Sequence, residues 1–284
     1  MVLLETWHGT PLKKLALDLG EVMASAPLTK RDVYRHACEW DYLIVPNQFS
    51  ADIFRRCFLY QGVLLKTGYP RNDMLYLEES GRRKKVDAVR QELGIPEDRK
   101  VILYAPTWRD DEYYAPAKHS FCLQMDLKKM RDGLGSEYVL LLRTHYYVAE
   151  KLDLSEYSGF LYDVSGYPDI AELYLISDLL ITDYSSVFFD YANLRRPMLF
   201  FTYDLEKYRD ILRGFYMDME EELPGPMLFT TEEIIASVEN LDQIQAEYEE
   251  KYNIFYKKYC GWEDGRASQR VVDAVFGREQ ESAE

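Results

Sequence analysis

The feature that most constrains the fold is a regular alternation of short apolar runs with segments of helical periodicity. The apolar runs are rich in Val, Ile and Leu, and each is short enough to be one buried strand. This alternation favours a parallel α/β sheet over an all-α or all-β fold. The runs expected to form strands are 41–46, 63–68, 101–106, 138–143, 179–182 and 198–201.

The expected helices fall between and after these strands. They are a helix that follows Ser50, with Ile53, Phe54, Cys57 and Phe58 on one face, and helices over 81–93, 126–132, 170–177 and 186–193. A mostly helical tail over 231–276 is expected to pack back on the sheet. A polar bridge near residue 97 suggests two domains, 1–97 and 98–284. The second has enough strands for a nucleotide-binding α/β domain. The first has only two or three, which predicts a small or partial domain.

Composition and charge exclude several classes of protein. The chain is 47% hydrophobic and 29% charged, as in globular proteins. Its formal net charge of −15 argues against a nucleic-acid partner. No apolar run approaches the ~20 residues that span a bilayer, and the first residues do not resemble a signal peptide. The four cysteines are widely scattered, which predicts reduced thiols in a cytoplasmic protein and no zinc site.

Polar side chains follow three of the predicted strands. Thr107 follows the strand at 101–106, Arg143 and His145 follow the next, and Ser185 and Ser186 follow 179–182. Ligands of open parallel sheets bind at the carboxyl ends of the strands, and these side chains suit phosphate oxygens. The helix expected after Ser186 would add free N–H groups. Taken singly, each serine could be only a helix cap, and Arg143 only an ion-pair partner.

Two of the four histidines are candidates for acid–base chemistry. His8 stands in a turn, Trp7-His8-Gly9-Thr10-Pro11, where the glycine allows close approach to a ligand. His145 comes at a strand end. Imidazole suits a general base because its pKa lies near neutrality.

Other well-known sites are excluded by their motifs. The sequence has neither a P-loop nor a G-x-G-x-x-G fingerprint, and Ser185-Ser186 lacks the G-x-S-x-G context of a hydrolase nucleophile. The acidic cluster at 110–112 is interpreted as a solvated loop, so no metal site is predicted.

Together these motifs resemble the CDP-glycerol:poly(glycerophosphate) glycerophosphotransferase family, the teichoic acid polymerases and primases of Gram-positive bacteria with related capsule polymerases. The resemblance covers almost the whole chain in the family's order. It rests on the segments Trp7-His8-Gly9-Thr10-Pro11-Leu12-Lys13-Lys14, Asn47-Gln48-Phe49-Ser50, Gly68-Tyr69-Pro70-Arg71-Asn72-Asp73, Tyr104-Ala105-Pro106-Thr107-Trp108-Arg109, Leu142-Arg143-Thr144-His145 and, the longest, from Ile170-Ala171-Glu172-Leu173-Tyr174 through Asp183-Tyr184-Ser185-Ser186-Val187-Phe188-Phe189-Asp190-Tyr191-Ala192.

The resemblance implies a GT-B architecture, in which two Rossmann-like domains face each other across a cleft. It also implies transfer of a polyol phosphate, typically glycerol phosphate from CDP-glycerol, to the terminal hydroxyl of a polymer on a lipid carrier. His8 would be the base and His145 would contact the pyrophosphate, with no metal or cofactor required. The residues that the resemblance places at the substrate are Trp7, Gly9, Thr10, Arg71, Thr107, Arg143, Thr144, Ser185, Ser186 and Asp190. For Asp190 the alternatives are contact with a ligand hydroxyl or ordering of the loop.

Members of the family carry more sequence before the Trp-His-Gly motif, so the first half of the acceptor-side domain is expected to be absent here. The expected partners are a CDP-alditol and a lipid-linked polyol-phosphate acceptor, with at most peripheral contact at the inner face of the membrane. Two alternatives remain open: a GT-B glycosyltransferase that uses a nucleotide sugar, and a non-catalytic CDP-binding fragment.

Overall fold

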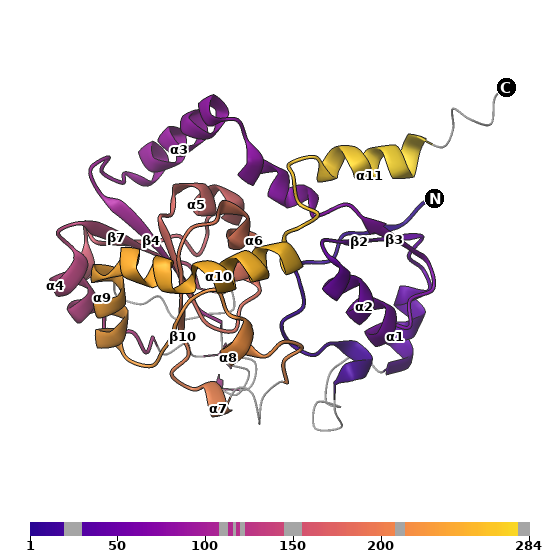
Figure 1. Cartoon of the computed structure of the whole chain (residues 1–284), viewed down its shortest axis with the longest axis horizontal. Helices are drawn as coiled ribbons and strands as arrows, with labels where there is room; N and C mark the ends of the chain where they lie inside the picture. Colours follow the sequence, from indigo (N-terminus) through magenta and orange to yellow (C-terminus); the bar gives the residue numbers. More distant parts are fainter. Residues whose placement is uncertain are drawn as a thin grey trace.

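The computed structural model describes residues 1–19, 30–107, 113–115, 118–119, 123–144, 155–207 and 214–277, and it contains two parallel sheets side by side (Figure 1). The smaller sheet has the strand order β1-β2-β3 and the larger one β11-β10-β9-β4-β7-β8. Their strands are β1 (Leu4–Glu5), β2 (Tyr42–Val45), β3 (Val63–Lys66), β4 (Lys100–Ala105), β7 (Tyr138–Leu142), β8 (Leu161–Asp163), β9 (Leu179–Thr182), β10 (Met198–Phe201) and β11 (Met227–Leu228); β5 (Tyr113–Ala115) and β6 (Lys118–His119) form a separate antiparallel pair.

Helices connect and cover the strands. The α-helices are α1 (Lys30–Ala37), α2 (Gln48–Cys57), α3 (Glu79–Leu93), α4 (Leu127–Leu134), α5 (Ile170–Ile176), α6 (Val187–Tyr191), α7 (Leu205–Lys207), α8 (Met219–Glu222), α9 (Thr231–Glu239), α10 (Leu241–Tyr259) and α11 (Ala267–Phe276). The 3-10 helices are η1 (Ala16–Asp18), η3 (Pro70–Tyr76), η4 (Ser155–Tyr157) and η5 (Ala192–Leu194).

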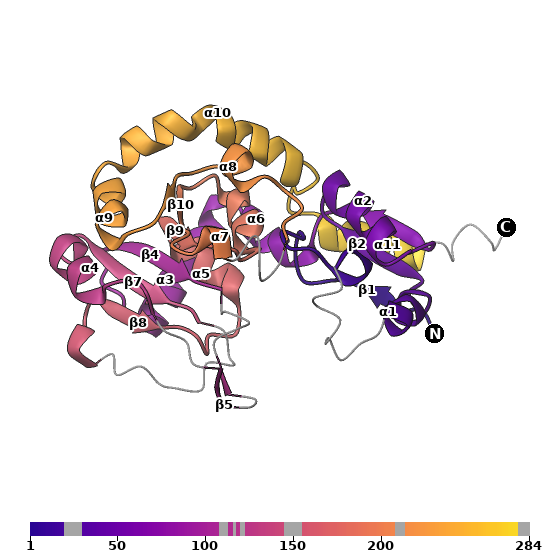
Figure 2. The same ribbon diagram turned by 90° about the horizontal axis from the view of Figure 1, so that it is seen from below.

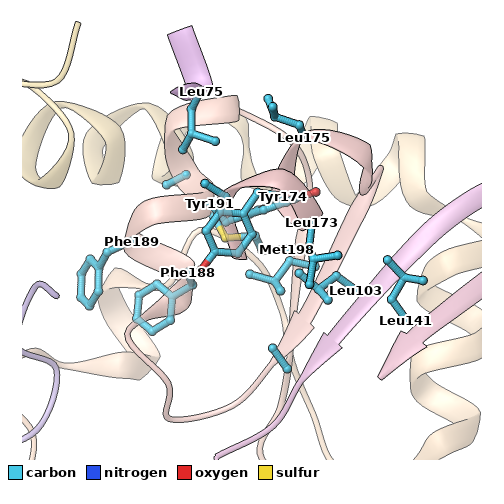
Figure 3. Close-up of a cluster of buried hydrophobic side chains, with 14 of the residues drawn as sticks. Leu75, Leu103, Leu141, Leu173, Tyr174, Leu175, Phe188, Phe189, Tyr191 and Met198 are labelled. Carbon is cyan, nitrogen blue, oxygen red and sulfur yellow. The ribbon is translucent and has the colours of Figure 1, made fainter. Parts of the chain in front are cut away.

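The larger sheet is buried on both faces. Alternate residues of β4 enter different cores: Val101 and Leu103 pack under α5, α6 and α10, whereas Ile102 and Tyr104 pack under α4 and α9. A strand covered on both faces must be apolar at every position, which explains the continuous apolar runs in the sequence. Figure 3 shows part of the first core, where side chains of the sheet meet those of α5 and α6.

The strand order of the larger sheet reverses at β4. The chain proceeds from β4 to β7 and β8 on one side and then returns to β9 on the other side. In open α/β sheets such a reversal opens a crevice at the carboxyl ends of the strands. The residues that follow β4, β7 and β9 therefore meet at one edge, as the sequence predicts.

The smaller sheet is covered by helices from opposite ends of the chain. Leu43 and Val45 of β2 pack with α2, and Ile44 between them packs with Val271 of α11 on the other face. Figures 1 and 2 show α10 arching across the larger sheet before α11 reaches the smaller one. The tail thus packs on both sheets rather than on one.

The domain boundary at residue 97 stays a prediction. Two sets of packing contacts cross this boundary. Leu75 of η3 and Val89 of α3 belong to the core of the larger sheet, and α11 belongs to the smaller sheet. The N-terminal segment also forms a backbone hydrogen bond with the predicted second domain: the Lys14 N–H donates to the Gly214 carbonyl at 2.9 Å.

The six strands predicted from apolar runs are confirmed, with ends that differ by at most two residues. The sequence analysis missed β1, β8 and β11, which have two or three residues each. The mostly helical tail is confirmed and consists of the three helices α9, α10 and α11.

Among the helices of the described ranges, none has the length and apolar character needed to cross a membrane.

Candidate active site

A cleft with a volume of about 520 Å³ opens at the carboxyl ends of β4, β7 and β9. One wall is the segment from Trp7 to Leu15, and the other is made of residues that follow the strands. Most of the described candidates from the sequence analysis line this cleft: Trp7, His8, Gly9, Thr10, Thr107, Arg143, Thr144, Ser185 and Ser186.

The loop that carries His8 is anchored at its start by aromatic packing. The Trp7 ring lies 5.5 Å from the Phe54 ring and 4.9 Å from the Phe58 ring, between centroids, in the core of the smaller sheet. The His8 ring stacks on Trp7 with a centroid distance of 4.4 Å. The Trp7 N–H donates to Glu5 Oε1 at 2.7 Å. These contacts fix the plane of the imidazole at the cleft.

The far end of the same loop is anchored by Thr10 and Leu12. Leu12 is buried in the core of the larger sheet. The Thr10 hydroxyl accepts a hydrogen bond from Asn47 Nδ2 at 3.2 Å, so this buried side chain holds the loop. A Cβ on Gly9 would lie 2.9 Å from Ser186 Oγ, a distance that real Cβ atoms do not show. A larger residue at position 9 would therefore force the Ser186 side chain to move, and glycine lets the loop approach the opposite wall this closely without that shift.

The environment of His8 favours the neutral imidazole. Burial lowers the pKa of His8, the nearby Arg71 guanidinium lowers it further, and the Glu5 carboxylate acts in the opposite direction. A neutral imidazole at neutral pH can accept a proton, and the ring keeps exposed surface in the cleft.

Replacing Glu5 with glutamine is expected to lower the pKa of His8 further. The substitution removes the one negative charge that raises this pKa and leaves an oxygen to accept the Trp7 N–H. An NMR pH titration of the imidazole C–H signals measures the shift, with Glu39→Gln, an exposed glutamate, as control. An unchanged or raised His8 pKa would contradict this account.

On the opposite wall, Thr107 is held through its backbone N–H, and the two serines stand at the start of α6. The Thr107 N–H donates to Asp183 Oδ1 at 2.8 Å, which joins the ends of β4 and β9. Ser186 is the N-cap residue of α6, yet its side chain makes no capping hydrogen bond. Among the described residues, Ser185 Oγ accepts a long hydrogen bond of 3.5 Å from the Val187 N–H. Capping alone therefore does not account for Ser186.

The end of β7 is bound to the loop that follows β8. Arg143 Nη1 donates to the carbonyls of Val164 and Tyr167 at 2.8 and 2.7 Å. Burial lowers the pKa of the Arg143 guanidinium. Thr144 N–H donates to Ser165 Oγ at 3.0 Å. In the described part of the chain, the hydrogen bonds of the Arg143 side chain run to backbone carbonyls, so the ion-pair alternative is not observed there.

A buried polar network lies beside the His8 loop. Arg71 donates three hydrogen bonds of 3.1–3.2 Å to the Asp190 carboxylate and stacks on the Tyr69 ring, with 3.9 Å from Cζ to the centroid. Asn72 Nδ2 bridges Asp190 Oδ1 at 3.0 Å and Glu263 Oε1 at 3.1 Å. Since protein donors occupy Asp190, its arrangement matches the alternative in which it orders the loop.

Replacing Glu263 with glutamine is expected to change how stability depends on pH. Burial raises the pKa of Glu263 from 4.5 to about 7, so its ionised form is the destabilised one in the folded state. The wild type therefore loses stability as pH rises from 4.5 through 7. Between pH 5 and pH 8.5, the free energy of unfolding of the variant should gain about 2 kcal/mol relative to the wild type.

Urea unfolding across this pH range measures the difference. Glu239→Gln, on the exposed end of α9, is the control that should show no such trend. A constant difference between Glu263→Gln and the wild type would contradict the buried-carboxyl account.

Some predicted residues are not brought to the cleft by the described structure. His145 lies outside the described residues, and Arg71 and Asp190 stand beside the cleft in the polar network. Ser165 and Glu263 were missed by the sequence analysis. Within the described ranges, no group of His, Cys, Asp or Glu side chains is arranged to hold a metal ion.

The comparisons with known sequences agree on one family. Residues 1–277 match the family described as CDP-Glycerol:Poly(glycerophosphate) glycerophosphotransferase. The teichoic acid poly(glycerol phosphate) polymerase of Bacillus subtilis (strain 168) is 50% identical over 97% of this chain. The chain spans only 37% of that relative. The teichoic acid glycerol-phosphate transferase of Staphylococcus aureus is 45% identical, over 96% of this chain and 70% of the relative.

Solved structures give the same result for the fold. The wall teichoic acid polymerase TagF superimposes with a TM-score of 0.90 at 46% identity, over 100% of this chain and 70% of that one. The UDP-GlcNAc 2-epimerase from Neisseria meningitidis, at 15% identity and a TM-score of 0.52, covers 93% of this chain and 69% of its own, and shares the fold alone. The predicted α/β, GT-B-like architecture is thereby confirmed.

Proposed function

The chain belongs to the CDP-glycerol:poly(glycerophosphate) glycerophosphotransferase family, and we propose that it transfers glycerol phosphate from CDP-glycerol to the terminal hydroxyl of a poly(glycerol phosphate) chain. The observation that carries the proposal is the His8 imidazole, held on Trp7 at a cleft whose opposite wall offers hydroxyl and N–H donors. Glycerol as the polyol is supported by four relatives of 45–50% identity, all of them glycerol phosphate polymerases or transferases. A poly(ribitol-phosphate) polymerase is 36% identical, and two glycerol-phosphate primases are 33% and 32% identical.

The proposed step is a phosphoryl transfer. The acceptor hydroxyl attacks the phosphorus that carries glycerol, a new P–O bond forms, and the bond to the bridging oxygen breaks to release CMP. His8 takes the proton of the attacking hydroxyl. Its lowered pKa supports this role, because the imidazole is already neutral when the hydroxyl arrives.

The strand-end wall would bind the diphosphate. The hydroxyls of Ser185 and Ser186 and the guanidinium of Arg143 are the donors that we assign to its oxygens, with Thr107 and Thr144 beside them. Such contacts position the reacting groups and stabilise the charge that develops in the transition state. The pyrophosphate contact of His145 rests on the family resemblance. The proposal requires no metal, which stays a prediction.

The acceptor and the cellular location are also part of the proposal. A lipid-linked poly(glycerol phosphate) chain as acceptor, and a place at the inner face of the cell membrane, follow from the resemblance alone.

The test is release of CMP from CDP-glycerol in the presence of a poly(glycerol phosphate) primer. We expect CMP release that depends on the primer. CDP-glycerol should also raise the melting temperature by about 5 °C at 100 times its Kd, whereas UDP-GlcNAc should not. Stabilisation by UDP-GlcNAc instead would favour a sugar transferase. Binding of CDP-glycerol without CMP release on any primer would support the alternative of a non-catalytic CDP-binding fragment.

A further inference from the structure

The loop after β8 brings one more hydroxyl to the cleft. Ser165 lines the cleft beside Thr144. Its N–H donates to Asp163 Oδ1 at 2.9 Å, which fixes the turn, and Arg143 holds the same loop through the carbonyls of Val164 and Tyr167. The Ser165 side chain is therefore placed by contacts on both sides of it in the sequence.

The hydrogen bonds of this side chain leave a proton to donate. Ser165 Oγ already accepts the Thr144 N–H at 3.0 Å, and it lies 2.9 Å from Thr144 Oγ1. Two hydroxyls carry two protons, and the bond between them uses one. Among the described residues, no carbonyl or carboxylate accepts the second proton from either hydroxyl. Since both residues line the cleft, a ligand oxygen there can accept it.

We propose that Ser165 is a further substrate-binding residue, whose hydroxyl, paired with that of Thr144, donates to an oxygen of the nucleotide diphosphate. An anionic oxygen is the expected ligand because it accepts hydrogen bonds and donates none. It therefore suits the donors of this hydroxyl pair and of the neighbouring Arg143 guanidinium. This inference rests on the proposed function and adds a residue from the loop after β8, a strand that the sequence analysis did not recognise.

The experiment compares Ser165→Ala with the wild type by isothermal titration calorimetry, using CDP-glycerol, inorganic pyrophosphate and cytidine. Loss of a hydrogen bond to a charged oxygen should weaken CDP-glycerol and pyrophosphate about tenfold or more. Cytidine affinity should stay unchanged, because cytidine has no phosphate. Ser165→Thr, which keeps the hydroxyl, should restore the affinity, and Ser158→Ala, an exposed serine before β8, should have no effect.

The outcomes separate the two proposals. Equal weakening of cytidine and CDP-glycerol would indicate a structural role and overturn the inference, as would unchanged affinity for all three ligands. If wild-type protein does not bind CDP-glycerol, the proposed function fails. The pyrophosphate titration then decides on Ser165 alone. Binding that is at least tenfold weaker in Ser165→Ala than in the wild type supports the inference. Equal affinity of the two proteins, or no binding of pyrophosphate to the wild type, overturns it.

Discussion

Replacing His8 with alanine is expected to lower the rate of primer-dependent CMP release by about 10²–10⁴-fold, the usual contribution of a general base. The imidazole is the titratable side chain that the Trp7 stack holds at the cleft, and its lowered pKa keeps it able to accept a proton. The loop should keep its position in the variant, since its anchors are Trp7, Thr10 and Leu12. Binding of CDP-glycerol should change little, because the proton is transferred only in the reaction.

The measurement is the initial rate of CMP release at saturating CDP-glycerol, together with a titration of CDP-glycerol binding. His36→Ala is the matched control, because His36 is exposed on α1 and is not among the residues that line the cleft. His145→Ala tests the second histidine in the same assay and is expected to abolish release. Full activity of His8→Ala would remove the base from the mechanism.

Replacing Asp190 with alanine is expected to lower the free energy of unfolding by about 3 kcal/mol, the range measured when one partner of a buried ion pair is removed. The Asp190 side chain is 12% exposed and accepts hydrogen bonds from both Arg71 and Asn72. Without the carboxylate, the buried Asn72 amide loses a partner, and the Arg71 guanidinium, whose side chain is 33% exposed, loses its ion pair.

Urea unfolding at pH 7 measures this loss. The matched control is Asp264→Ala, which removes another Arg–Asp pair, with Arg270, whose aspartate is 54% exposed. An exposed pair contributes 1 kcal/mol or less, so this variant should be nearly as stable as the wild type. Equal losses in the two variants would show that burial of the Asp190 network does not matter for stability.

Features that a local sequence pattern determines were predicted well, whereas contacts between residues far apart in the sequence were not. Strands such as β4 and β9 were predictable because all their residues except Lys100 are buried, so that continuous apolar runs mark them. β8 has three residues, too few for a pattern, and Ser165 was missed with it. The carboxyl-end rule placed Thr107, Arg143 and Ser186 at the cleft without any knowledge of their partners.

Long-range partners were outside the reach of local patterns. Thr10 was predicted to lie at the substrate, and Asp190 either to contact a ligand hydroxyl or to order the loop, and these roles stay predictions. No local pattern showed that their hydrogen bonds run to Asn47 and Arg71, 37 and 119 residues away in the sequence. Glu263 is 191 residues from Asn72, and nothing in its neighbourhood marks it as buried.

The path of the last helix limits how relatives could exchange parts. A recombinant gene that joins the first half of one enzyme to the second half of another would pair Ile44 of one parent with Val271 of the other. A functional chimaera therefore needs residues 1–69 and α11 from the same parent, with two crossover points rather than one. Natural variation in this family should show the same linkage, with substitutions on β2 accompanied by substitutions on the inner face of α11.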